Sequence, residues 1–156
     1  VPLIVSHMFV FYFGIMADLT PPVALAAFAA ASIAKASPLR IGWKATNIAI
    51  AGFVLPYMAV YDPALMLQPD KSGSLSLVAV VYIVFKAVVA IGLWGGAAVG
   101  YLRAPINVAE RIFAFAAASF LVAAAAWTDQ VGFAMSAAFI AWHFWRTRRM
   151  PASAAT

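Results

Sequence analysis

The chain contains 156 residues, of which 66% are hydrophobic and 10% are charged, and it has no cysteine. Soluble domains contain about 45–50% apolar and about 25% charged residues, so this composition indicates an integral membrane protein and excludes an ordinary soluble domain. Without cysteine the chain has no disulfide framework, no thiolate nucleophile and no cysteine-based metal site. The net charge of +5 comes mainly from basic residues at the ends of apolar runs, where topology requires them, so we expect no nucleic-acid partner.

The first residues enter an apolar run directly. Val1-Pro2-Leu3-Ile4 has neither an initiator methionine nor a basic segment, a pattern unlike a signal peptide. We therefore expect the sequence to be the C-terminal part of a larger membrane protein.

The apolar runs predict an all-α integral membrane fold with about five membrane segments. The first, residues 1–36, is a discontinuous helix broken at Asp18–Pro22, and the second spans residues 38–61 with a possible kink at Pro56. A loop rich in turn-forming residues follows at 62–74. Further segments are predicted at 75–102, 108–126 and 131–146, with an interfacial turn at Trp127–Gln130 and a short polar tail after the last helix.

The basic residues give an independent prediction of topology. If each segment crosses once, one side receives nearly all of them: Lys35, Arg40, Lys44, Arg103, Arg111, Arg146, Arg148 and Arg149. The opposite side receives residues 62–74 and 127–130, where Lys71 is the only basic residue. The positive-inside rule then predicts a cytoplasmic C-terminus and places the Asp18–Pro22 break away from both membrane interfaces.

The break itself is the strongest candidate for a functional site. Pro21 and Pro22 lack backbone N–H groups, so the carbonyls of Ala17 and Asp18 lose their helical donors. We expect Met16 and Leu19 to follow if the turn unwinds, and a new helix to begin at Pro22 with Thr20 as its cap.

Asp18 and Thr20 add a carboxylate and a hydroxyl to this opening, and bare carbonyls in hydrocarbon need protein, water or an ion as a partner. Oxygen ligands at a discontinuous membrane helix are typical of an ion or substrate site in secondary transporters. The alternative is a proline-kinked structural helix with Asp18 at the interface. The predicted topology favours the site, because it places Asp18 at depth.

Three other polar residues lie within or beside apolar segments. His7 and Lys86 are possible secondary site residues, although a hydrogen-bonded packing role for His7 and structural pairing of Lys86 with a neighbour are the favoured alternatives. His143 lies between Trp142 and Trp145, and we expect it to belong to the same membrane interface.

A family resemblance is carried by the run GIMADLTPPVALAAF at residues 14–28, and mainly by Gly14 and the pattern Leu19-Thr20-Pro21-Pro22-Val23. This run resembles the second half of the large membrane subunit of tripartite ATP-independent periplasmic (TRAP) transporters. Later patterns at residues 42–45, 53–57 and 61–65 look more specifically like the fused permeases of the TAXI branch, in which the small and large membrane subunits form one polypeptide.

The resemblance implies an elevator-type secondary transporter with an inverted repeat, located in the bacterial inner membrane. Residues 1–68 would form the C-terminal end of its transport core and residues 69–156 would be additional helices. A periplasmic solute-binding receptor would deliver a small organic anion, such as a carboxylate, and Na⁺ or H⁺ would drive uptake without any other cofactor. Gly14, Thr20 and Pro21 match the family motif, with Pro22 beside them and Asp18 just before it, so the resemblance implies a sodium candidate at Gly14, Asp18 and Thr20.

Two other function classes compete with transport. An intramembrane aspartyl protease needs two facing carboxylates, and only Asp18 is predicted at depth. The sequence also lacks a Gly-x-Ser-x-Gly or His-Glu-x-x-His pattern, so we expect no enzyme. A non-transporting scaffold or assembly subunit would explain the glycine stripe at residues 92–100 and the topology, but not the Thr-Pro-Pro break.

Overall fold

The computed structural model describes residues 1–69, 76–123 and 126–148. These residues form helices and turns, and no β-strand occurs among them. The predicted all-α class is therefore confirmed. The chain divides into two compact units, residues 1–85 and the part from residue 86 onward.

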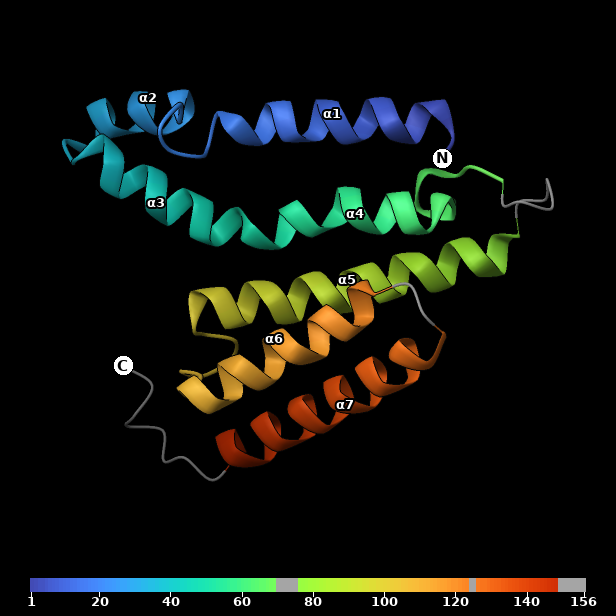
Figure 1. Ribbon diagram of the computed structural model, residues 1–156. Helices are drawn as coiled ribbons and strands as arrows, with labels where there is room; N and C mark the ends of the chain where they lie inside the picture. Colours follow the sequence, from blue (N-terminus) through green and yellow to red (C-terminus); the bar gives the residue numbers. More distant parts are fainter. Residues whose placement is uncertain (70–75, 124–125, 149–156) are drawn as a thin grey trace. The chain divides into compact units, whose positions relative to one another are not determined.

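The first unit is built from two layers of helix (Figure 1). One layer contains α1 (Leu3–Ala17) and α2 (Leu25–Ala34), and the other contains α3 (Pro38–Ala49), η1 (Ile50–Phe53) and α4 (Val54–Tyr61), followed by η2 (Pro63–Met66). The helix α1 packs against α4, and α2 packs against α3. An aromatic cluster joins α1 to the η1–α4 segment, with Phe9 5.4 Å and Phe13 5.8 Å from Tyr57 between ring centroids.

The predicted span at residues 38–61 has the expected ends, but it is not one continuous α-helix. The 3₁₀ segment Ile50–Phe53 interrupts it. Pro56 cannot donate a hydrogen bond to the carbonyl of Gly52, so the backbone tightens before the proline and resumes as α4.

The second unit contains most of α5 (Leu77–Val99), together with α6 (Val108–Val122) and α7 (Ala126–Arg148). Small side chains allow α6 and α7 to pack closely, and Ala114, Ala117, Ala118 and Leu121 are fully buried. The N-terminus of α6 is closed by a capping box between Asn107 and Glu110.

The predicted interfacial turn at Trp127–Gln130 is wrong, because these residues form the first turns of α7. As a result α7 begins at Ala126 rather than 131, and α6 ends at Val122 rather than 126. An acidic side chain is favourable in the first turn of a helix, where Asp129 lies. Thr128 also donates a hydrogen bond of 3.0 Å to the carbonyl of Ala123, just beyond α6.

His143 differs in burial from its neighbours Trp142 and Trp145, and the membrane interface expected for all three stays a prediction. Both tryptophans are exposed, whereas His143 has no exposed surface. Its ring stacks on Phe139 at 5.9 Å between centroids and 17° between planes. His143 therefore lies on the packed face of α7.

Among the described residues, only Leu77–Val99 is both long and apolar enough to cross a membrane by itself. The helices α1 and α2 are apolar but shorter. The fold is thus consistent with a membrane protein, whereas the full set of about five predicted segments stays a prediction. Parts of the predicted loop at 62–74 and the tail after residue 148 lie outside the described residues.

Candidate ion-binding site at the broken helix

The predicted break in the first helix is confirmed. The helix α1 ends at Ala17 and α2 begins at Leu25, so residues 18–24 form a non-helical connection that includes a cis peptide bond between Pro21 and Pro22. The expected restart at Pro22 is wrong. The cap of α2 is Ala24, in a left-handed conformation at φ 41°, and Thr20 does not cap this helix.

The backbone tightens as it leaves α1. The N–H groups of Asp18, Leu19 and Thr20 donate to the carbonyls three residues earlier, at distances of 3.2, 3.1 and 3.2 Å. This is the hydrogen-bond pattern of a 3₁₀ turn, which commonly ends an α-helix before a proline. The first of these bonds ends on the carbonyl oxygen of Ile15, the residue that follows Gly14.

The carbonyls of the break find other donors, which corrects the expectation that they are bare. The N–H of Ala24 lies 3.2 Å from the carbonyl oxygen of Ala17 and 3.0 Å from that of Thr20. The N–H of Ala26 lies 3.1 Å from the carbonyl oxygen of Asp18. The left-handed backbone at Ala24 turns the start of α2 back toward the end of α1, so α2 supplies the donors that the prolines cannot.

The polar side chains of the break differ in exposure and in hydrogen bonding. Thr20 is half-buried and donates from Oγ1 to the carbonyl of Met16 at 2.5 Å. Asp18 is exposed, and no described residue donates to its carboxylate. Gly14 is exposed too, and a side chain at this position would meet no atom within 4 Å.

Helix α3 supports the break from the side. Thr46 Oγ1 lies 3.2 Å from the carbonyl oxygen of Leu19 and 2.9 Å from that of Gly42 on its own helix. Gly42 is buried, and a Cβ there would lie 3.0 Å from Cγ of Pro21. Sequence reasoning did not find the contact of Thr46 with the break, because Thr46 lies 27 residues from Leu19 in the chain.

The oxygen atoms of the break suit a small hard cation, which prefers carbonyl, hydroxyl and carboxylate ligands. A carbonyl oxygen accepts two hydrogen bonds. The carbonyls of Asp18, Leu19 and Thr20 each have one donor among the described residues, so each retains acceptor capacity beside the exposed Asp18 carboxylate. In the described part of the chain no three His, Cys, Asp or Glu residues gather as a metal site, so a cation here would depend largely on backbone oxygens.

The two secondary candidates each have a partner within their own unit. His7 Nδ1 lies 2.9 Å from the carbonyl oxygen of Leu3, one turn earlier in α1. This contact is the kind expected of a hydrogen-bonded structural histidine. Lys86 belongs to the second unit and pairs with Asp129.

Comparison with known protein families gives a match to the N-terminal part of the chain. Residues 1–70 match the family described as tripartite ATP-independent periplasmic transporter, DctM component, which is a transporter component and not an enzyme family. No match is found among curated proteins or among solved structures. The match covers less than half of the chain, and it includes the whole break and its support from α3. Over these residues the chain is similar to the DctM component, a membrane component of TRAP transporters.

Proposed function

We propose that the chain is part of a TAXI-type fused TRAP permease, an elevator-type secondary transporter that imports small organic anions across the bacterial inner membrane. The single observation that carries this proposal is the opening between α1 and α2. There an exposed carboxylate and three backbone carbonyls with remaining acceptor capacity lie inside the family-matched segment.

In this proposal the coupling ion, Na⁺ or H⁺, is held at the break. Asp18 supplies a carboxylate, and Leu19 and Thr20 supply carbonyl oxygens. The hydroxyl of Thr20 fixes the end of α1 through Met16, and the exposed Gly14 leaves the turn before the break open. The N-terminal end of α2 adds a partial positive charge that suits an anionic substrate.

The remaining parts of the proposal follow from the type of transporter. A periplasmic solute-binding receptor would deliver the anion, and the remainder of the permease would supply the other half of the inverted repeat. The C-terminus would lie in the cytoplasm. A scaffold role is the second candidate for the second unit alone, because the family match ends before it and its helices pack through small residues.

The test is uptake by the intact permease in proteoliposomes, with and without its receptor. We expect uptake of a small carboxylate that requires the receptor and a gradient of Na⁺ or H⁺. Measuring each gradient separately identifies the coupling ion. Receptor-dependent uptake that needs neither gradient would remove the role proposed for the break.

A further inference from the structure

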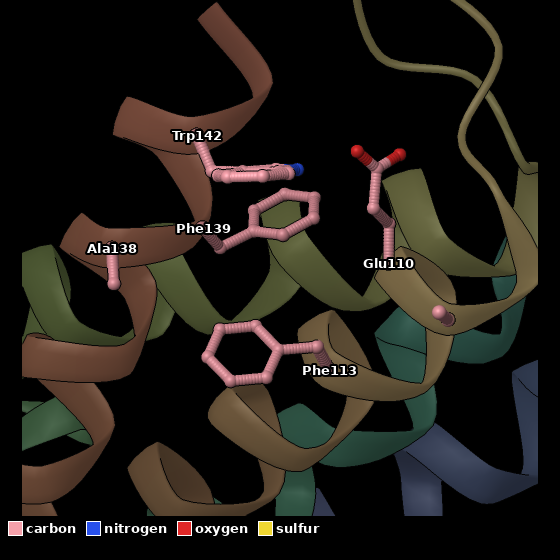
Figure 2. Close-up of a pocket in the computed structure, with 6 residues that line it drawn as sticks. Glu110, Phe113, Ala138, Phe139 and Trp142 are labelled. Carbon is pink, nitrogen blue, oxygen red and sulfur yellow. The ribbon is translucent and has the colours of Figure 1, made fainter. Parts of the chain in front are cut away.

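A second site lies between α6 and α7, in the unit that the family match does not reach. A cavity of about 360 Å³ is lined there by Ala109, Glu110, Phe113, Ala138, Phe139 and Trp142 (Figure 2). The walls are aromatic rings and methyl groups, and Glu110 is the charged member of the lining. The cavity is therefore amphipathic, with one polar end.

The two carboxylate oxygens of Glu110 differ in their hydrogen-bond partners. Oε2 accepts from the backbone N–H of Asn107 at 3.0 Å and lies 3.1 Å from Nη2 of Arg146. Oε1 is buried, and no described residue donates to it. Glu110 is only 9% exposed, and a buried carboxylate oxygen without a donor is costly. The site is thus complementary to a ligand that brings a hydrogen-bond donor.

Trp142 forms the part of the cavity lining that faces this carboxylate. Its indole lies across the cavity with the nitrogen-bearing edge toward the Glu110 carboxylate (Figure 2). Trp142 is 56% exposed, so this aromatic wall of the cavity lies at the surface of the α6–α7 pair.

The surrounding residues are those of a membrane interface. Trp142 lies 5.6 Å from Trp145 between ring centroids, and Arg146 and Arg148 follow in the last turn of α7. Exposed Arg103 places its guanidinium 5.5 Å from the ring centroid of Phe144 on the same helix. Tryptophan and arginine concentrate where hydrocarbon meets lipid headgroups, so the polar end of the cavity belongs at headgroup level.

We propose that this cavity binds a phospholipid whose headgroup carries a primary ammonium. The ammonium donates to Glu110 Oε1, the phosphate lies near the guanidinium groups of Arg103 and Arg148, and an acyl chain occupies the apolar wall beside Phe113 and Phe139. A ligand with a net positive charge fits less well than a zwitterionic headgroup, because Arg146 already neutralises the charge of Glu110. A quaternary ammonium has no N–H to donate, and a purely anionic headgroup brings a charge toward the carboxylate. The inference is independent of the function proposed for the break.

The test is native mass spectrometry of the intact permease in detergent, titrated separately with phosphatidylethanolamine, phosphatidylcholine and phosphatidylglycerol of identical acyl chains. We expect phosphatidylethanolamine to be retained roughly tenfold more tightly than the other two, the size of one hydrogen bond to a charged group. Glu110→Gln should abolish this preference. Glutamine keeps the capping box, and thermal unfolding confirms that the helix remains folded.

Two further variants locate the lipid. Ala138→Phe fills the cavity and should abolish retention, whereas Ala137→Phe, at the exposed neighbouring position outside the lining, should not. Equal retention of phosphatidylethanolamine and phosphatidylcholine by the unaltered protein would overturn the headgroup assignment. Retention that survives Ala138→Phe, or a peptide or detergent found in place of lipid, would overturn the site.

Discussion

Lys86 Nζ lies 2.5 Å from Oδ1 of Asp129, and the two side chains are only 6% and 17% exposed. The pair joins α5 to the first turn of α7. It explains how a lysine is accommodated within an otherwise apolar 23-residue helix, because a buried charge is tolerated when it is paired. The geometry favours structural pairing over a transport role for Lys86.

The first prediction concerns this pair. Lys86→Met should lower the free energy of unfolding by about 3–5 kcal/mol, because it removes the cation of this pair and keeps the buried carboxylate of Asp129. The double variant Lys86→Met/Asp129→Leu should recover most of that loss, since it removes both charges. Denaturant unfolding in detergent measures both variants. A double variant as unstable as the single one would contradict the pairing.

The second prediction tests Thr20 in the intact permease. Thr20→Ala removes the hydroxyl that binds the Met16 carbonyl, so the end of α1 loosens. We expect the half-saturating sodium concentration for uptake to rise roughly tenfold, equivalent to about 1.4 kcal/mol. Ser32→Ala removes a hydroxyl bonded within α2 and is the matched control. Unchanged sodium dependence in Thr20→Ala would refute the assignment.

The third prediction separates a site from a kink at Asp18. Asp18→Asn keeps the shape of the exposed side chain and removes its charge. Because no described residue pairs with the carboxylate, stability should change little, within about 0.5 kcal/mol for a surface position. Transport should be lost or show a shifted pH profile. A pH profile of transport equal to that of the unaltered permease would show that Asp18 has a structural role only.

The fourth prediction concerns the support that α3 gives to the break. Thr46→Val removes the hydroxyl that lies between the carbonyls of Leu19 and Gly42, and Thr46→Ser restores it. We expect the valine variant to lose about 1 kcal/mol of stability and the serine variant to lose less. Thr147→Val is the control, because its hydroxyl donates only to His143 in its own helix. Equal losses at positions 46 and 147 would show that the bond to Leu19 contributes nothing.

The fifth prediction uses two glycines in the second unit. At Gly132 a Cβ would lie 2.9 Å from the side chain and 3.0 Å from the backbone nitrogen of Leu121, which is fully buried. Gly132→Ala should therefore destabilise the α6–α7 packing by about 1–3 kcal/mol. At Gly92 nothing lies within 4 Å, so Gly92→Ala should stabilise its helix by up to about 1 kcal/mol. Thermal unfolding of both variants tests this contrast, and an equal response would contradict it.

Local chemistry made several features predictable from the sequence alone. The break between α1 and α2 follows from Pro21 and Pro22, which cannot donate hydrogen bonds wherever they are placed. The start of α3 at Pro38 and the start of α6 after Asn107 depend on residues only a few positions apart. The oxygen-rich character of the candidate site could be predicted for the same reason.

Only the tertiary structure decided which groups meet. The donors to the break come from the start of α2 and from Thr46, and the partner of Lys86 lies on another helix. His143 is buried and stacks on Phe139. These outcomes depend on packing between segments distant in sequence. The residues themselves determined that the first helix must open, and the fold determined which hydrogen bonds close around the opening.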